Sequence, residues 1–166
     1  MNQSIASLVQ ALSKLLEKSS IKIALAESCT GGQLAAYLTA QAGSSLWFDR
    51  GFVTYSNASK IESVGVSPSI IEQYGAVSEE VAKAMAQGAL NHSAAKTSIA
   101  ITGIAGPGGS TKNKPVGMVC FAWAAQLPGS PVLLIASTQI FDGDRQAIRE
   151  QACAYALNEL IQILRK

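Results

Sequence analysis

The feature that most constrains this chain is a short apolar segment followed by a turn of small residues and then a helical segment. The apolar segment, residues 21–26 (IKIALA), is short and begins with β-branched residues, which predicts a strand. Residues 27–32 (ESCTGG) form the turn, and residues 33–40 favour a helix. A strand, a turn and a helix in this order are typical of an α/β unit. We therefore expect a sheet that helices cover.

The remaining patterns continue this alternation. Further strands are expected at 46–56 (interrupted at 49–51), 97–102, 116–125 and 132–141, with the last two forming a hairpin. Further helices are expected at 5–16, in a short segment capped by Asn57, from Pro68 to Gly75, over 78–91, and after a cap at 142–144. Together they predict an α/β fold, a three-layer α/β/α sandwich around a mixed, mostly parallel sheet of about five strands. We expect a single domain over residues 1–166.

Composition excludes several classes of protein. Hydrophobic residues make up 48% of the 166 residues and charged residues only 14%, the reverse of a disordered chain. The 13 basic and 11 acidic residues form no basic patch, so we expect no nucleic-acid partner. The uncharged stretch 115–141 is broken by a Pro/Gly turn at 126–131, so we expect no membrane span. The low charge implies either a large core or a surface covered by a partner subunit.

Cysteine and histidine are too sparse for a metal site. The three cysteines, Cys29, Cys120 and Cys153, are far apart in the sequence, and His92 is the only histidine. Neither a zinc site nor a disulfide framework is therefore expected, and a reducing cytosol fits this composition best.

The turn at 27–32 offers two nucleophiles. A serine at the start of a helix, here Ser28, lies beside unpaired N–H groups that could hold an oxyanion. In the simpler interpretation, Ser28 or Thr30 only caps the helix. Cys29 is the rival nucleophile, because a helix N-terminus lowers a thiol pKa, although its side chain could equally point into the core.

A serine nucleophile needs a base. His92 falls late in a helix and is expected at the surface, so lysine is the substitute to consider. Lys60 is the only charged residue between Arg50 and Glu62 and follows a predicted strand end. Its other interpretation is an ordinary solvated lysine. A lysine is a poor base at neutral pH until burial or nearby charge lowers its pKa.

Two further turns contain small residues. Residues 43–45 (GSS) read as an ordinary connector. Residues 102–109 (TGIAGPGG) follow a strand directly, and their backbone N–H groups could hold a phosphate. This second turn matches neither a P-loop nor a dinucleotide-binding fingerprint.

Taken together, the segments resemble a known family. The stretches that carry the resemblance are 26–32 (AESCTGG), 43–45 with Phe48, 50–57 (RGFVTYSN) with Lys60, 75–78 (GAVS), 102–107 (TGIAGP), 114–117 (KPVG) and 143–145 (GDR). In this order, and over nearly the whole chain, they are similar to the CinA C-terminal domain family of PncC-type nicotinamide-nucleotide amidohydrolases. The chain resembles the stand-alone form, without a preceding nucleotide-binding domain.

The resemblance implies an enzyme that hydrolyses nicotinamide mononucleotide to nicotinate mononucleotide and ammonia. It implies Ser28 as the nucleophile, Lys60 as its dyad partner and Tyr55 as a supporting hydroxyl. The residues expected to bind substrate are Cys29, Thr30, Gly31, Gly32, Ser45, Thr102, Gly103, Gly106 and Arg145. No metal or organic cofactor is expected. The family also implies a cytoplasmic homodimer acting on a small pyridine nucleotide.

Two other classes of function stay open at this point. In the first, the same loops and Arg145 bind a nucleotide without catalysis, as a regulatory domain, and Ser28 only caps a helix. In the second, the weakly charged surface makes the chain an interaction protein. Product formation from a nucleotide separates the enzyme from both.

Overall fold

The computed structural model describes residues 4–166. The strands are β1 (Ile23–Glu27), β2 (Phe48–Val53), β3 (Thr97–Gly103), β4 (Met118–Ala125) and β5 (Leu133–Ile140). The helices are α1 (Ile5–Ser19), α2 (Gln33–Thr39), α3 (Asn57–Val64), α4 (Pro68–Tyr74), α5 (Glu79–Asn91) and α6 (Arg145–Leu164), and a 3₁₀ turn, η1, covers Ser44–Leu46.

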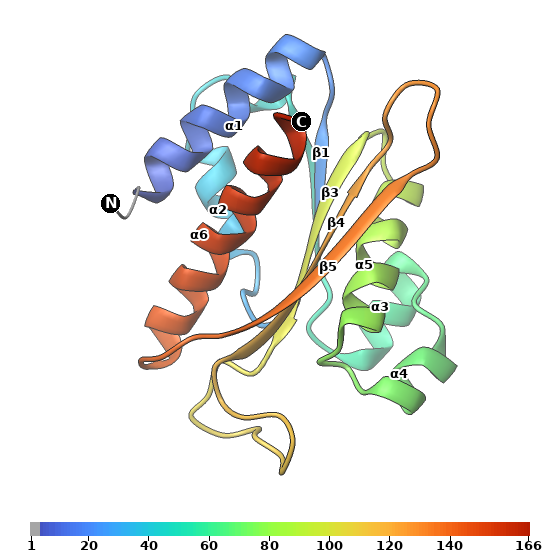
Figure 1. The fold of residues 1–166 in the computed structure, drawn as a ribbon, viewed down its shortest axis with the longest axis vertical. Helices are drawn as coiled ribbons and strands as arrows, with labels where there is room; N and C mark the ends of the chain where they lie inside the picture. The colour runs from blue at the N-terminus through green and yellow to red at the C-terminus, as the bar shows by residue number, and fades with distance from the viewer. Residues whose placement is uncertain (1–3) are drawn as a thin grey trace.

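The strands form one sheet in the order β2-β1-β3-β4-β5 (Figure 1). β1 pairs in parallel with both β2 and β3, whereas β4 pairs antiparallel with β3 and with β5. β4 therefore runs against the other four strands. This confirms the predicted mixed, mostly parallel sheet and the hairpin of β4 and β5.

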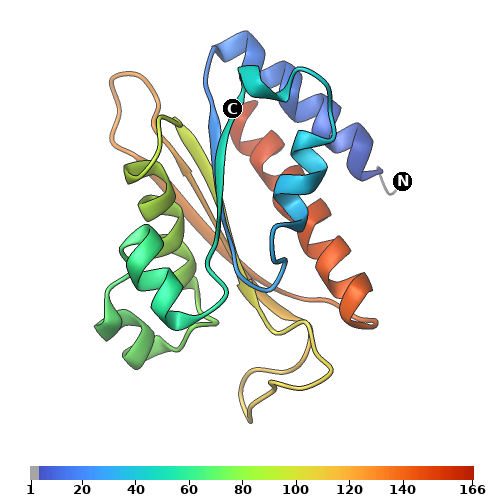
Figure 2. The same ribbon diagram turned by 180° about the vertical axis from the view of Figure 1, so that it is seen from behind.

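Helices cover both faces of the sheet (Figures 1 and 2). α1, α2 and α6 lie on one face, and α3, α4 and α5 lie on the other. Large side chains such as Leu25, Ile99 and Phe121 point into the first core. Small side chains such as Ala26 and Ala100 point toward α5, which lets that helix pack close to the sheet. The three-layer α/β/α architecture is thus confirmed.

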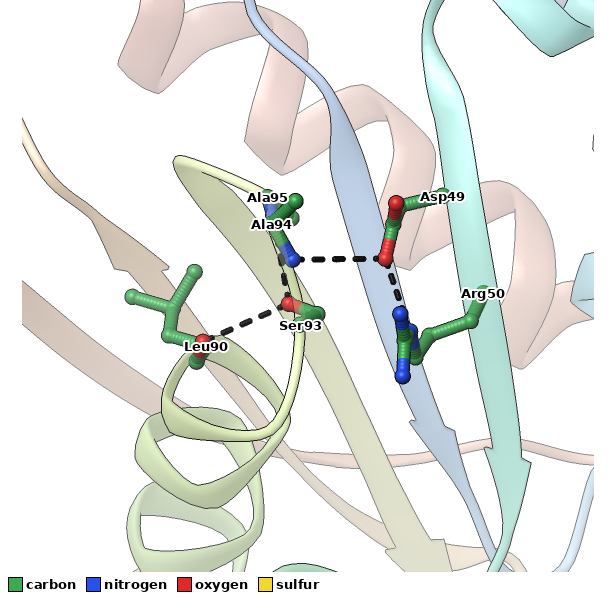
Figure 3. Close-up of polar contacts among 6 residues, drawn as sticks. All are labelled: Asp49, Arg50, Leu90, Ser93, Ala94 and Ala95. Carbon is green, nitrogen blue, oxygen red and sulfur yellow. Dashed lines mark hydrogen bonds and ion pairs between the residues drawn. The ribbon is translucent and has the colours of Figure 1, made fainter.

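The structure corrects the interruption predicted in the second strand. β2 runs unbroken through residues 49–51, but its register with β1 jumps from Phe48 to Arg50, so Asp49 is an extra, bulged residue. The Asp49 carboxylate accepts hydrogen bonds from the Ala94 backbone N–H at 3.4 Å and from Arg50 Nε at 2.7 Å (Figure 3). The polar residues mark a bulge that is fastened to the turn before β3.

The cap predicted for α3 is also corrected by one residue. Ser56, not Asn57, is the N-cap, and it forms a reciprocal capping box with Ser59. Because of this box, only three residues, 54–56, separate the end of β2 from the start of α3. The box thereby sets where Lys60, on the first turn of α3, meets the end of the sheet. By contrast, the predicted ends of α4 at Gly75 and of the turn before α6 at Asp144 are confirmed.

Within residues 4–166, no helix combines the length and apolarity needed to cross a membrane.

Candidate active site

The candidate site lies where the parallel strands end. Ser28 follows β1 directly, and its N–H continues the ladder to the Ile101 carbonyl of β3 at 2.9 Å. Thr54 follows β2, and its N–H bonds to the Glu27 carbonyl at 2.8 Å. The chain leaves β1 for α2 on one face and leaves β2 for α3 on the other. Ligands of open α/β sheets bind beyond such strand ends, where the connections diverge.

The structure brings Ser28 and Lys60 into contact. Lys60 Nζ lies 3.0 Å from Ser28 Oγ and 2.9 Å from the Thr54 carbonyl oxygen. Lys60 is 1% exposed and Ser28 is 8% exposed. The solvated-lysine interpretation of Lys60 is therefore wrong: this side chain crosses from α3 to the nucleophile loop through the interior.

Burial lowers the pKa of the Lys60 ammonium below its ordinary value near 10.5, and a smaller interaction with Cys29 opposes the shift. The ion pair between Arg50 and Asp49 is the only one among residues 4–166, so no carboxylate there holds Lys60 in its charged form. A neutral amine keeps one lone pair. With the Thr54 carbonyl accepting one N–H, that lone pair is free to take the Ser28 proton.

The turn between Ser28 and α2 is held by Glu27. This buried carboxylate accepts hydrogen bonds from the N–H groups of Gly32, Leu34 and Ala35 at 3.2, 3.0 and 2.8 Å. A negative side chain there complements the positive end of the helix. The prediction that Ser28 or Thr30 caps α2 is therefore wrong, since the N-cap is Gly32 and Glu27 takes the N–H groups. The Ser28 hydroxyl is left for Lys60.

The same turn is held from the opposite side by Arg149 of α6. Arg149 Nε donates to the Cys29 carbonyl at 3.1 Å, and Nη2 donates to the Thr30 carbonyl at 2.8 Å. The turn also bonds internally, from the Gly31 N–H to the Ser28 carbonyl at 3.0 Å. In the described chain, the N–H groups of Cys29 and Thr30 have no acceptor other than the Cys29 side chain itself.

Cys29 is not poised to act as a nucleophile. Its side chain belongs to the core between the sheet and α6. Burial raises the pKa of the Cys29 thiol to about 12, so the reactive thiolate is scarce at neutral pH. His92 is exposed, as predicted, in the turn after α5. Of the bases weighed from the sequence, only Lys60 touches a candidate nucleophile.

A pocket of about 210 Å³ opens beside Ser28. It is lined by Ser28, Cys29, Tyr55, Gly103, Ile104, Ala105, Gly106, Gly108, Gly109 and Arg145. Arg145 Nη1 donates to the Gly106 carbonyl at 2.8 Å, and Nη2 donates to the Tyr55 hydroxyl at 3.0 Å. A guanidinium, a phenol and a glycine-rich loop thus converge at one mouth, a combination suited to an anionic ligand.

The other predicted binding residues lie elsewhere. Thr30, Gly31 and Gly32 shape the turn but do not line the pocket. Thr102 is buried, and its hydroxyl donates to the Ala76 carbonyl at 2.7 Å. Ser45 is exposed in η1, before β2, whereas Ser28 follows β1, and because these two strands are parallel the two serines lie at opposite ends of the sheet. Within one chain, Ser45 and Ser28 are not brought together.

The sequence interpretation missed three residues that build the site: Glu27, Thr54 and Arg149. Glu27 and Thr54 fall inside stretches that carried the family resemblance, but their roles depend on strand pairing. Arg149 comes from α6, more than a hundred residues along the chain from the turn that it holds. Only the unusual placement of Glu27, a charge at the end of an apolar strand, was a usable signal.

Comparison with known proteins identifies the family. Residues 5–164 match the CinA C-terminal domain. The nicotinamide-nucleotide amidohydrolase PncC of Enterobacter agglomerans is 49% identical over 84% of this chain and 83% of its own length. A CinA-like protein of Mycolicibacterium paratuberculosis is 50% identical over 86% of this chain but only 33% of its own length. The crystal structure of a competence or damage-inducible protein from Enterobacter asburiae superposes with a TM-score of 0.91, at 35% identity, covering 98% of this chain and 99% of that one. The chain belongs to the CinA C-terminal domain family.

Proposed function

We propose that this protein hydrolyses the carboxamide of nicotinamide mononucleotide, releasing nicotinate mononucleotide and ammonia. Relatives named nicotinamide-nucleotide amidohydrolase PncC, 49% identical over most of the chain, support this reaction. The observation that carries the mechanism is the 3.0 Å contact between Lys60 Nζ and Ser28 Oγ in a buried setting. Such a pair supplies the nucleophile and base that amide hydrolysis requires.

The first step is acyl transfer to Ser28. Ser28 Oγ attacks the carboxamide carbon and passes its proton to neutral Lys60, so a C–O bond forms and the carbonyl oxygen becomes an oxyanion. Lys60 takes the proton directly. Within the described residues no hydrogen bond joins Tyr55 to either Ser28 or Lys60, so this mechanism does not use the Tyr55 hydroxyl to transfer the proton.

The oxyanion would be held by the N–H group of Cys29, a residue that lines the pocket. Cys29 immediately follows the nucleophile, and its N–H has no acceptor in a neighbouring residue, whereas Thr30 is fully buried and lies outside the pocket lining. The Gly31 N–H, which was also expected to contribute, is already bonded to the Ser28 carbonyl. Each such donor is typically worth about 3 kcal/mol of transition-state stabilisation.

Collapse of the tetrahedral species completes the turnover. Protonated Lys60 gives its proton to the leaving nitrogen as the C–N bond breaks, and ammonia departs. Lys60, neutral again, then takes a proton from water while the water oxygen attacks the acyl carbon. The ester breaks, the proton returns to Ser28, and nicotinate mononucleotide leaves. Neither a metal nor an organic cofactor takes part.

Arg145 and the loop 103–109 would bind the phosphate of the substrate. Arg145 is exposed at the pocket mouth and already reaches Tyr55 and Gly106. A phosphate can replace the phenol or the carbonyl as its partner, in a stronger charge-assisted contact. Tyr55, 59% exposed, accordingly belongs with the substrate contacts.

The alternative, a regulatory domain that binds nucleotides without catalysis, needs Ser28 to be only a cap. The capping carboxylate of Glu27 disfavours that role. Incubating the protein with a panel of pyridine nucleotides and identifying the products separates the two functions. Saturable binding with no ammonia released would favour the regulator. Stoichiometric ammonia and nicotinate mononucleotide support the amidohydrolase.

We also propose a cytoplasmic homodimer that pairs through β5. This edge strand has eight residues without a charge, a proline or a bulge, and Leu133, Leu134, Ile135 and Ile140 on it are exposed. Natural edge strands are normally protected, as β2 is by its bulge and by Arg50. Antiparallel pairing about Ser137 would set Leu134 opposite Ile140 of the second copy. Light scattering should find a dimer, and Ile140→Lys should yield a folded monomer. A monomeric wild type would refute the proposal.

A further inference from the structure

We propose that Arg149 is a positioning residue that fixes the nucleophile loop, and with it the Cys29 N–H that would bind the oxyanion. The inference rests on the proposed amide hydrolysis and deepens it. Arg149 lies on α6, whereas the loop follows β1, and its guanidinium connects the two through the carbonyls of Cys29 and Thr30. It does not line the pocket, so its effect on substrate must pass through the loop.

The geometry of the peptide bond explains the coupling. The Cys29 carbonyl and the Thr30 N–H belong to one planar trans peptide and point in opposite directions. When Arg149 Nε holds that carbonyl on the α6 side at 3.1 Å, the Thr30 N–H is fixed facing away from α6. The 2.8 Å bond from Nη2 to the Thr30 carbonyl fixes the next peptide, whose Gly31 N–H holds the Ser28 carbonyl, so the peptides on both sides of Cys29 are held in place.

The guanidinium also strengthens the Gly31 N–H, which shares a peptide with the Thr30 carbonyl and holds the Ser28 carbonyl at 3.0 Å. A cation bonded to a carbonyl polarises the whole peptide, which makes the N–H of that peptide a better donor. The Thr30 carbonyl also accepts the Gln33 N–H at 3.0 Å, but among the described residues Arg149 is the only donor to the Cys29 carbonyl, so the loop cannot hold that carbonyl alone.

Arg149 is fixed in turn by its surroundings. It is partly buried, and Nη1 lies 3.4 Å from the Gln146 side-chain oxygen one turn earlier on α6. Lysine cannot reproduce this arrangement, because one ammonium does not match the fork that bonds two carbonyls at once. Arg149→Lys therefore keeps the positive charge but loses the planar guanidinium, so this variant tests the shape of the side chain separately from its charge.

The experiment compares Arg149→Ala, Arg149→Lys and the control Arg165→Ala, an exposed arginine at the end of the same helix. Ammonia release from nicotinamide mononucleotide gives kcat and KM. We expect kcat to fall about 10- to 100-fold in both Arg149 variants, with KM within about threefold of wild type, as loss of transition-state positioning requires. Arg165→Ala should match wild type.

Two further measurements distinguish positioning from folding and from failure of the proposed function. Millimolar guanidinium should restore part of kcat in Arg149→Ala but not in Arg149→Lys, while the thermal midpoints of unfolding show that both variants are folded. A serine-directed sulfonyl fluoride labels Ser28 at a rate that mass spectrometry can follow. Without any nucleotide present, this rate should fall in both Arg149 variants and stay at the wild-type value in Arg165→Ala.

Normal kcat in Arg149→Ala, a loss confined to KM, or a loss matched by unfolding and not rescued by guanidinium would overturn the role of Arg149. A wild type that labels at Ser28 in an Arg149-dependent way but releases no ammonia would overturn the substrate and keep the positioning role. A wild type that does neither would overturn both.

Discussion

Lys60 Nζ and Ser28 Oγ lie 3.0 Å apart although 32 residues separate them in the chain. The contact forms because two local structures end at the same place. Ser28 is the first residue after β1, and the capping box of Ser56 and Ser59 starts α3 just beyond the neighbouring β2. The parallel pairing of β1 and β2 then sets the two side chains together at one edge of the sheet.

This contact predicts how activity depends on pH. Lys60 must be neutral to accept the Ser28 proton, so kcat/KM should rise with pH until it passes the lowered pKa of Lys60, and then level off. Lys60→Met should reduce the rate by about 10²- to 10⁴-fold and abolish this rise. Steady-state ammonia release across the neutral range measures both. Preserved rate and pH profile in Lys60→Met would exclude Lys60 as the base.

The same pKa shift makes a prediction about stability. Because the folded-state pKa lies below 10.5, the unfolded chain binds more protons than the folded chain between the two values. Lys60 therefore costs the fold most at low pH, and its cost falls as pH rises through that window. The stability advantage of Lys60→Met over wild type, from denaturant unfolding, should shrink in step. An advantage that does not change with pH would contradict the buried, shifted lysine.

Arg145 and Tyr55 should act on substrate binding. Arg145→Ala removes the charged group at the pocket mouth and should raise KM about 10- to 100-fold with a smaller change in kcat, in line with the ~1.5–3 kcal/mol of a charged hydrogen bond. Tyr55→Phe should raise KM less and leave the Lys60-dependent pH profile in place. If Tyr55→Phe instead abolished kcat at unchanged KM, the Tyr55 hydroxyl would have to take part in the proton transfer.

The packing of α5 against α3 at Gly88 also affects the candidate active site. A Cβ at this position of α5 would collide with the Val64 carbonyl at the end of α3. Gly88→Ala should therefore destabilise the fold by about 1–3 kcal/mol, since the backbone clash outweighs the gain in helix propensity of ~1 kcal/mol. Activity should also fall, because α3 carries Lys60. Gln87→Ala on the same helix is the control and should stay within about 0.5 kcal/mol. A stabilised Gly88→Ala would contradict this packing.

The sequence predicts those parts of the fold that depend on local patterns. The β-branched start of β1, the small-residue turn after it and the alternation of helices and strands are local signals, and the structure confirms them. At Asp49 the sequence predicts an interruption where the structure has a bulge, because polar residues occur in a strand in both cases. The bond from Asp49 to Ala94 that distinguishes them spans 45 residues.

The sequence predicts the reactive residues of the candidate site, but not the residues that hold them in place. Ser28 and Lys60 stood out because each is a reactive residue at a predicted strand end. Arg149 did not, because an arginine in an amphipathic helix gives no sign of the distant carbonyls that it holds. The cap of α2 was misassigned to Ser28 or Thr30, because Glu27 belongs to a strand and capping rules look only at residues nearest the helix. Ser45 stays a family expectation that a single chain does not connect to the pocket.

The most direct test of the whole account is the fate of Ser28 during turnover. Wild type should release ammonia from nicotinamide mononucleotide, and rapid acid quenching followed by mass spectrometry should find the nicotinoyl nucleotide bound to the Ser28 peptide. Ser28→Ala should lose both signals while staying folded, whereas Cys29→Ala should keep both. Full ammonia release by Ser28→Ala, or an acyl group on Cys29, would contradict the Ser28–Lys60 mechanism.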